Sequence, residues 1–139
     1  MSKSLIIAGV LGVVGVVIGS YAAHGLEVFL QKQDLLADVI AKRMSQCDVA
    51  VRYHMMHTLA ILAIGLSGLR SRMVSSAVTF WLLGIALFSG GLYSMVFLGK
   101  TGHWAIVPSG GLCFIIGWAL LIGIGLVAKS KDSKADAGL

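Results

Sequence analysis

Charged residues are scarce in this chain. Only 12% of its 139 residues are charged, whereas about 25% is usual in soluble domains. Hydrophobic residues make up 58% of the sequence, and the mean hydropathy is +0.93. This composition excludes an ordinary soluble domain and predicts an integral membrane protein surrounded by the lipid bilayer.

Acidic residues are scarcer than basic ones, and the net charge is +5. The basic residues flank apolar runs and do not form a stripe with interleaved aromatic side chains, which is the pattern of nucleic-acid-binding proteins. We therefore expect no nucleic-acid partner. Basic residues at the ends of apolar runs are typical of membrane helices, whose orientation they set.

Groups that commonly carry chemistry are missing or isolated. The two cysteines, Cys47 and Cys113, lack CxxC spacing, so the sequence predicts neither a disulfide framework nor a zinc motif. No Asp or Glu lies within an apolar run, which argues against an ion pathway built on carboxylates. There is no GxSxG elbow and no nucleotide-binding glycine motif. Cys47 with His54 is only a weak nucleophile–base pair, because no third group is identified to orient it. We predict that the protein is not an enzyme and holds no cofactor.

The chain does contain four apolar runs of the length that crosses a membrane, for which about 20 residues are needed. The strictly uncharged part of the second run has only 17 residues, so we extend this helix to residue 49 and expect Arg52 to reach the headgroups with its long side chain. A cleavable signal peptide is the alternative for the first run, but the run exceeds the usual apolar length of about 7–15 residues. The sequence predicts one all-α domain over residues 1–139, a four-transmembrane-helix bundle with helices at roughly 5–23, 49–69, 73–98 and 105–128.

Two segments are too polar to cross the membrane. Residues 27–47 combine charges of both signs with apolar residues at helical spacing, which predicts an amphipathic interfacial helix between the first two membrane helices, broken near Gln31-Lys32-Gln33. Residues 129–139 are predicted to form a short, polar and mobile tail.

Four crossings place both termini on one side of the membrane. Six Lys and Arg residues fall on that side and five on the other, and those on the terminal side lie closer to the helix ends. Because basic residues near helix ends favour the cytoplasm, we predict that both termini are cytoplasmic.

The densest polar cluster is Arg52-Tyr53-His54-Met55-Met56-His57, at the start of the second membrane helix. Tyr53 and His57 are four residues apart, and His54 and His57 three apart, so on a helix their side chains lie on adjacent faces. His24 ends the first helix and His103 lies in the last connection, so all four histidines are placed at one membrane face. The candidate ligand or polar cluster is therefore His24, Arg52, Tyr53, His54, His57 and His103. We predict that His24, Tyr53 and His57 meet between the first two membrane helices.

Three interpretations of these histidines remain open. They can cap helix ends and bind tyrosines or backbone carbonyls, which we favour because no spacing matches a ligand signature such as HExxH. They can bind copper or zinc together with the thioethers of Met55 and Met56, or supply an axial ligand to haem. They can also form a switch that responds to protonation.

Glycines recur in the apolar runs at spacings that allow membrane helices to approach closely. The predicted helix-packing positions are Gly12, Gly15, Gly19, Gly90, Gly110, Gly111 and Gly117.

Several motifs are spread over nearly the whole chain: Ala22-Ala23-His24-Gly25-Leu26, Val51-Arg52-Tyr53-His54-Met55-Met56-His57-Thr58-Leu59-Ala60, Phe88-Ser89-Gly90-Gly91-Leu92-Tyr93, Val107-Pro108-Ser109-Gly110-Gly111-Leu112 and Gly117-Trp118. In combination they resemble the motifs of the domain-of-unknown-function family 423 (DUF423), the YgdD-like small membrane proteins. The resemblance implies a four-helix protein of the bacterial inner membrane and supplies no activity. The positions that the family shares map here onto His24, Gly25, Tyr53, His57, Ser89, Gly90, Tyr93, Pro108, Gly110 and Gly111.

Two hypotheses about function follow. The first is a structural or interaction protein that associates through glycine-rich helix faces with itself or with a larger membrane complex, using Gly15, Gly19, Gly110 and Gly117. The second is a protein that binds a metal, haem or a small polar ligand at its histidine-rich membrane face.

Overall fold

The computed structural model describes residues 2–99 and 104–136, with side chains over 3–99 and 104–128. Every regular element in these residues is helical. Four helical runs are long and apolar enough to cross a membrane, namely Lys3–His24, Ala37–Leu66, Arg72–Phe97 and Ile106–Ala128. The predicted all-α architecture with four membrane helices is confirmed.

The chain begins with α1 (Ser2–His24), which is followed closely by the short α2 (Leu26–Gln31). Gly25 separates the two helices, with φ −128° and ψ −24°. A Cβ atom at Gly25 would lie 2.9 Å from a ring carbon of Tyr21, so any other residue at this bend would have to displace the tyrosine ring. The residues of α1 are apolar on all sides, as in a helix whose outer surface meets lipid.

The second membrane helix, α3 (Ala37–Leu66), is 30 residues long and corrects two predicted boundaries. It begins at Ala37 and not near residue 49, so the expected interfacial helix over 27–47 is divided between α2 and the first turns of α3. The chain does turn where a break was expected, after Gln31, with Asp34 at φ 51°. The apolar residues of this segment pack on α2 and α5, so burial against protein and not against lipid explains the longer helix.

The third membrane helix consists of α4 (Arg72–Gly84), the π-helical turn η1 (Ile85–Ser89) and α5 (Gly90–Phe97). Ser71 caps α4, because its Oγ accepts the N–H of Val74 at 3.1 Å. At the junction with α5, the N–H of Gly90 donates to the carbonyl of Ile85, five residues back, which is the bond that defines a π turn. The sequence predicted one helix over 73–98 without this turn.

The last helix, α6 (Ile106–Asp136), is longer than predicted. The expected boundary at 128 and the expected polar tail from 129 are corrected, because the helix continues to Asp136; residues 137–139 lie outside the described part. No glycine or proline interrupts residues 126–136, so the backbone can continue as a helix after the apolar residues end. Pro108 is the third residue of α6, where a missing N–H removes no intrahelical bond.

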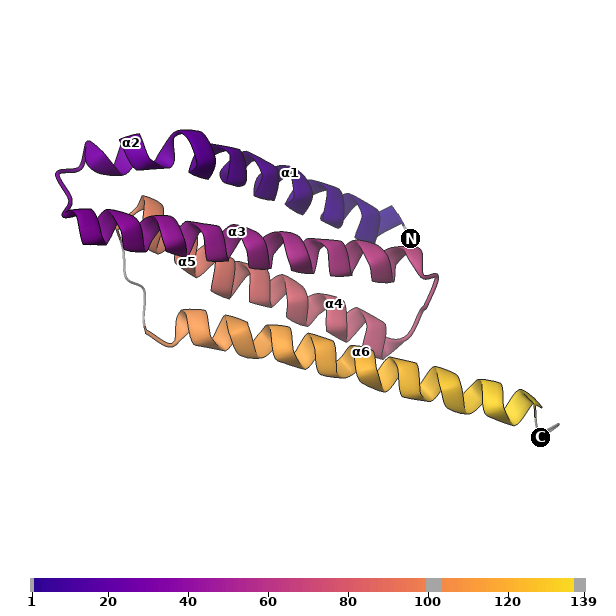
Figure 1. Cartoon of the computed structure of the whole chain (residues 1–139). Helices are drawn as coiled ribbons and strands as arrows, with labels where there is room; N and C mark the ends of the chain where they lie inside the picture. The colour runs from indigo at the N-terminus through magenta and orange to yellow at the C-terminus, as the bar shows by residue number, and fades with distance from the viewer. Residues whose placement is uncertain (1, 100–103, 137–139) are drawn as a thin grey trace.

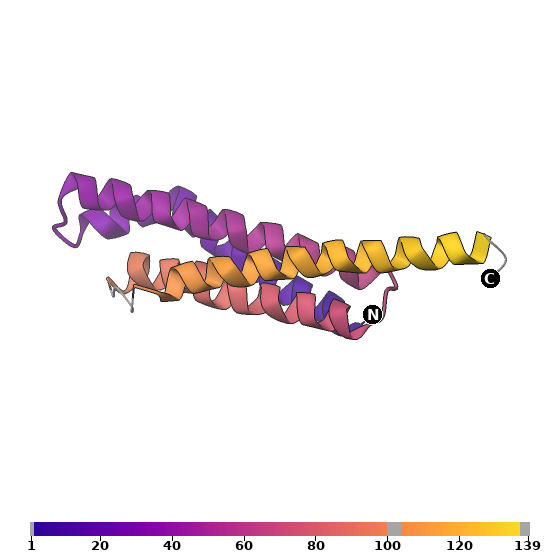
Figure 2. The same ribbon diagram turned by 90° about the horizontal axis from the view of Figure 1, so that it is seen from below.

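The four membrane helices pack mainly on their neighbours in chain order. α1 lies along α3, α3 packs on η1 and α5, and α4 and η1 pack on α6. Figures 1 and 2 show α1 at one edge of this arrangement and both ends of the chain at the same end of the bundle.

Two of the predicted packing glycines set the contact between α1 and α3. Gly15 is buried against Met55. A Cβ atom at Gly19 would lie 3.3 Å from a methyl group of Val51. A Cβ atom at Gly12, also predicted to pack, would meet no atom within 4 Å among the described residues outside its own stretch of helix.

Two others set the contact between α4–η1 and α6. A Cβ atom at Gly110 would lie 2.9 Å from the carbonyl carbon of Leu87, so the two backbones approach very closely. A Cβ atom at Gly117 would overlap the indole ring of Trp81. Both positions therefore pack within the bundle, where an added side chain would not fit.

The remaining two predicted glycines make ordinary contacts. The closest atoms to a Cβ at Gly111 and Gly90 lie at 3.9 Å and 3.8 Å. The sequence analysis overlooked Gly84, where a Cβ atom would overlap the ring of Phe114.

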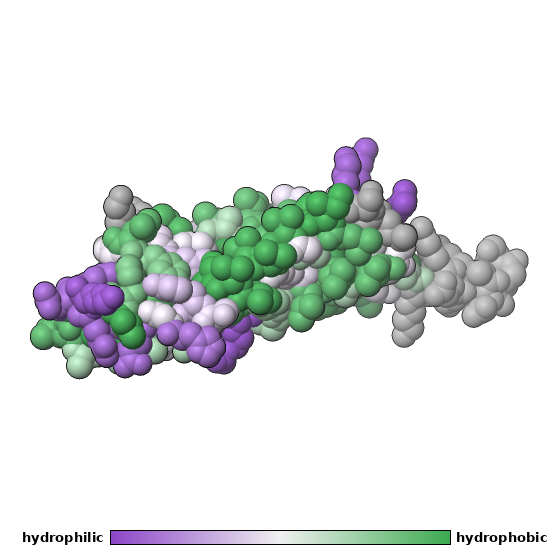
Figure 3. All heavy atoms as spheres, turned by 90° about the horizontal axis from the view of Figure 1, so that it is seen from above, coloured by the Kyte–Doolittle hydropathy of each residue, from purple (hydrophilic) through white to green (hydrophobic). Residues whose placement is uncertain are grey.

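Buried side chains form two clusters. The larger one lies among α1, α3, α4, η1 and α6 and includes Ile61, Trp81 and Phe114. The smaller one joins α2, the first half of α3 and α5, and includes Leu30 and Cys47. Figure 3 shows hydrophilic residues gathered toward the two ends of the molecule, with a mainly hydrophobic belt between them.

Candidate functional site: two buried histidines beside a π-helical turn

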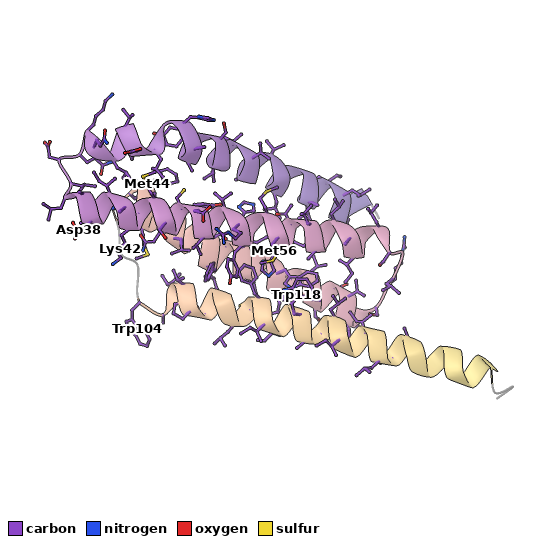
Figure 4. The ribbon with its side chains drawn as sticks, viewed as in Figure 1. Asp38, Lys42, Met44, Met56, Trp104 and Trp118 are labelled. Carbon is purple, nitrogen blue, oxygen red and sulfur yellow. The ribbon has the colours of Figure 1, made fainter. Side chains whose placement is uncertain are left out.

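The gap between α3 and α6 is bridged by side chains. Figure 4 shows Met56 projecting from α3 toward α6, and Trp118 projecting from α6 toward α3. His57, on α3, is 1% exposed. Its ring stacks on Phe114, with ring centroids 3.5 Å apart and planes at 12°. The histidine therefore connects two helices that lie on either side of the third membrane helix.

Both ring nitrogens of His57 are engaged. The indole N–H of Trp118 donates to Nε2 at 3.1 Å. An indole nitrogen can only donate, so Nε2 must be the acceptor, and in the neutral ring Nδ1 then carries the proton. Nδ1 in turn lies 2.8 Å from the carbonyl oxygen of Tyr53, to which it donates. His57 is thus a fully bonded neutral imidazole with no lone pair left for a metal ion.

His54 differs from His57 in having one free nitrogen. It is 3% exposed, and its Nδ1 lies 3.3 Å from the hydroxyl of Tyr93 on α5. Its Nε2 is buried and makes no hydrogen bond of good geometry in the described part of the chain, although the backbone of Leu11 on α1 lies close enough to interact with the ring. The neighbouring ring carbon Cδ2 faces α1, 3.7 Å from the position of a Cβ atom at Gly15. The free nitrogen therefore lies on the side of the ring that faces α1.

Ser89 is a second buried polar group without a partner. It ends the π-helical turn, is fully buried, and its Oγ makes no hydrogen bond within the described residues. In the sequence it follows Phe88, whose ring is 4.8 Å from that of Tyr53. It precedes by four residues Tyr93, whose ring contacts that of His54. Buried polar groups normally have partners, so His54, Ser89 and the buried indole N–H of Trp81, which also lacks a partner within the described residues, are the groups here that can still bind a small polar molecule.

Of the other predicted cluster residues, Tyr53 belongs to this site and Arg52 does not. The Tyr53 ring packs on Phe88 and its carbonyl accepts the bond from His57. Arg52 forms an ion pair with Asp48, one turn away, and both side chains are well exposed, at 69% and 65%. An exposed pair of this kind contributes little to stability and nothing to the buried site.

His24 lies apart from the buried histidines. Along α1, Gly15 faces Met55 and Gly19 faces Val51, so the two helices run antiparallel. His24 is then level with about residue 46 of α3, roughly 16 Å along the helix axis from His57. Its side chain is exposed. The predicted meeting of His24 with Tyr53 and His57 is corrected to Tyr53 and His57 alone, and His103 lies outside the described residues.

In the described part of the chain, no three His, Cys, Asp or Glu side chains come together as metal ligands do. Cys47 and Cys113 are both free. Cys47 precedes His54 by seven residues, about 10 Å along the helix axis, which is too far for a nucleophile and its base.

The sequence analysis overlooked Trp118 and Trp81 as parts of this region. Trp118 bonds His57, and the Trp81 ring lies 5.0 Å from that of Trp118. A useful signal was available, since tryptophans usually gather near the membrane surfaces, whereas both of these fall well inside apolar runs. An indole N–H in such a place needs an acceptor. Trp118 has one in His57, whereas the buried Nε1 of Trp81 has none within the described residues.

Comparison with known proteins supports a single family. A family model described as protein of unknown function (DUF423) matches residues 18–111. A UPF0382 membrane protein of Haemophilus influenzae is 38% identical over 121 residues, covering 86% of this chain and 90% of its own. The UPF0382 inner membrane protein YgdD of Escherichia coli is 35% identical over 132 residues, covering 91% and 92%. A UPF0382 membrane protein of Staphylococcus epidermidis is 41% identical over 122 residues, covering 86% and 93%. No solved structure matches the chain.

Proposed function

Since the chain belongs to the DUF423 family of membrane proteins of unknown function, we propose that it is a structural or interaction protein of the bacterial inner membrane. It associates there with further copies of itself or with a larger membrane complex. The name of the Escherichia coli relative, an inner membrane protein, supports this location. The four apolar helices support a multi-pass arrangement.

The observation that carries the proposal is the exposed apolar face of α1. Only 11% of its most apolar window is buried within the chain, against 33% for the window in Ala37–Leu66. Val13 and Val16 are 65% and 61% exposed. Helix α1 packs mainly on α3, at the edge of the bundle, so its outer face is open to another helix.

Two glycines on α1 face open space among the described residues. A Cβ atom at Gly9 or Gly12 would meet no atom within 4 Å among the described residues outside its own stretch of helix. A glycine inside a helix costs roughly 0.5–1 kcal/mol relative to alanine, and close approach of a neighbouring membrane helix offsets that cost. Gly15, Gly110 and Gly117 were expected to contact other chains, but they pack against helices of the same chain. The proposal therefore assigns the contacts with other chains to Gly9 and Gly12.

The protein is further proposed to have no catalytic activity of its own. His57 is locked as a neutral imidazole by Tyr53 and Trp118, and Cys47 is too far from His54 to be activated by it. Both observations support a structural use of the histidines.

A second candidate function is the binding of a small polar molecule, favoured by the buried and unpartnered Nε2 of His54 and Oγ of Ser89. The engaged nitrogens of His57 weigh against metal or haem coordination there and leave His54 as the ligand-binding histidine in this alternative.

Cysteine crosslinking in native membranes tests the association. In a background carrying Cys47→Ala and Cys113→Ala, Val13→Cys and Val16→Cys place a thiol on the outer face of α1. Ala8→Cys, buried against the core, is the matched control. We expect oxidation or a short bismaleimide to join the outer positions to a second copy or to another membrane protein, with little product from the control. Uncrosslinked chains at both outer positions, together with a native mass of 14.6 kDa in mild detergent, would contradict the proposal.

A further inference from the structure

A cavity of about 810 Å³ opens at the end of the bundle where both termini lie. It is formed by the connection between α3 and α4, the first turn of α4 and the start of α1. Its polar lining consists of Ser4, Arg70, Ser71, Arg72, Ser75 and Ser76. Among the described residues, no acidic side chain lines it. The cavity therefore combines two permanent positive charges with four hydroxyl groups.

The two arginines have no counter-charge among the described residues. The ion pair found there joins Arg52 and Asp48, on the far side of the hydrophobic belt. Neither the Arg70 nor the Arg72 side chain makes a hydrogen bond or ion pair within the described part of the chain. Guanidinium groups bind phosphate through paired N–H donors, and serine hydroxyls add single donors. The chemistry of this lining fits a phosphate group with several acceptor oxygens.

Two apolar cavities adjoin the polar one. The first, about 250 Å³, lies among α3, α4 and α6 and is lined by Leu69, Trp81 and Trp118 among others. The second, about 220 Å³, lies between α4 and α6 and is lined by Leu69, Arg70 and Met73 among others. Leu69 lines all three cavities, and Arg70 lines the polar one and the second apolar one. A ligand with a charged head and an apolar body fits this arrangement better than a free ion does.

The position along the membrane axis agrees with this chemistry. Arg70 is the first charged residue after the uncharged run from Tyr53 to Leu69, and it lies just beyond the end of α3 at Leu66, where the long apolar stretch ends. Basic pockets between membrane helices at this depth meet the headgroups of lipids. We propose that the Arg70–Arg72 cavity binds the phosphate of an anionic glycerophospholipid, whose acyl chains enter the two apolar cavities beside Leu69.

Native mass spectrometry of the full chain in a non-ionic detergent tests the site. Phosphatidylglycerol and phosphatidylcholine with identical acyl chains are titrated separately, and the apparent dissociation constants are compared. We expect phosphatidylglycerol to bind more tightly. The variant Arg70→Gln/Arg72→Gln should bind it about 25-fold more weakly, about fivefold for each basic residue near a membrane surface.

The matched control is Lys42→Gln/Arg52→Gln, which removes the same charge from exposed residues at the opposite end of the bundle. It should bind phosphatidylglycerol as the unaltered chain does. Because all four side chains are exposed, no variant is expected to lose its fold, and circular dichroism checks this. Equal weakening by both pairs, or no weakening by Arg70→Gln/Arg72→Gln, would overturn the site.

A further comparison separates the two sources of phosphate. Inorganic phosphate is added alone, and the shift in melting temperature is compared with that produced by phosphatidylglycerol with long or six-carbon acyl chains. The proposal expects the long-chain lipid to produce the largest shift and free phosphate the smallest. Protection by inorganic phosphate equal to that by long-chain lipid would assign the cavity to free phosphate and overturn the lipid.

Discussion

Trp118 on α6 donates its indole N–H to Nε2 of His57 on α3 at 3.1 Å, although the two residues are 61 positions apart in the chain. This bond determines the chemistry of the histidine. Since Nε2 accepts and Nδ1 donates to the carbonyl of Tyr53, the imidazole is neutral and cannot gain a proton without losing its bond to Trp118. A residue that the sequence marked as a candidate ligand is thereby used to hold α3 and α6 together.

The tautomer of His57 is directly measurable. We expect nitrogen NMR of histidine-labelled protein to show, for His57, a protonated Nδ1 and an unprotonated Nε2. The His57→Ala variant assigns the signals. A protonated Nε2, or an imidazolium near neutral pH, would contradict the hydrogen bond from Trp118.

The energy of the His57–Trp118 bond can be isolated by a double-mutant cycle. Trp118→Phe removes the donor, and His57→Ala removes the acceptor together with the stacking on Phe114. Interhelical hydrogen bonds in membranes average about 0.6 kcal/mol and reach about 1.7 kcal/mol, so we expect a coupling energy in that range from unfolding in mild detergent. A parallel cycle of Trp118→Phe with His24→Ala should show no coupling, because His24 is exposed at the end of α1. Coupling in both cycles, or in neither, would contradict this assignment.

The membrane helices were predictable because their signal is local. Twenty or so apolar residues bounded by charges require a helix in lipid, whatever the rest of the chain does. The start of α3 was not predictable in this way. Residues 37–48 are polar enough to lie in water, and they belong to α3 because Cys47 and its neighbours pack on Leu30 and Val96. Such contacts join distant parts of the chain and leave no periodicity of their own in the sequence.

The site was predictable only in part for the same reason. The spacing of Tyr53 and His57 indicated their contact, which lies within one helix turn. The partners of the two histidines on other helices, Trp118 and Tyr93, depend on how those helices pack. The grouping of His24 with His57 assumed that α3 begins near residue 49. Because α3 begins at Ala37, His57 lies well inside the helix, at a different depth from His24, and the grouping was wrong.

The glycines of α6 and α1 should respond in opposite ways to alanine. Gly110→Ala places a Cβ 2.9 Å from the carbonyl carbon of Leu87, and backbone atoms cannot give way cheaply, so we expect a loss of about 1–3 kcal/mol in the free energy of unfolding. Gly12→Ala meets no atom within 4 Å among the described residues outside its own stretch of helix, so the monomer should be unchanged or stabilised by up to about 1 kcal/mol. Similar losses for both variants would show that the contact between η1 and α6 is looser than described.

The orientation of the bundle is testable with reporter fusions. We expect a reporter fused after the last residue to be active only as a cytoplasmic protein, since the terminal side carries Lys3, Arg70 and Arg72 close to helix ends. A reporter inserted in the turn between α2 and α3, at residues 32–36, should be active only when exported. The reverse pattern would place the Arg70–Arg72 end outside the cytoplasm.

The π-helical turn predicts an unusual tolerance to deletion. A π turn contains one residue more than an α turn, because its bonds join residues five apart and not four. Removing Ala86, an exposed residue within η1, lets the helix continue as α-helix while α4 and α5 keep the faces that they present to α6 and α3. We expect this deletion to leave a folded protein in mild detergent.

Deleting Thr79, which is also exposed but lies in the regular helix α4, is the matched control. That deletion rotates residues 72–78 by about 100° relative to the rest of the helix. It therefore turns away from their partners either the buried Ala77, before the deletion, or Trp81 and Tyr93, after it. It should therefore abolish the cooperative thermal transition that the Ala86 deletion retains. If the two deletions are equally damaging, the packing around η1 requires its extra residue. The buried hydroxyl of Ser89, at the end of η1, would then be the first group to test, with the variant Ser89→Ala.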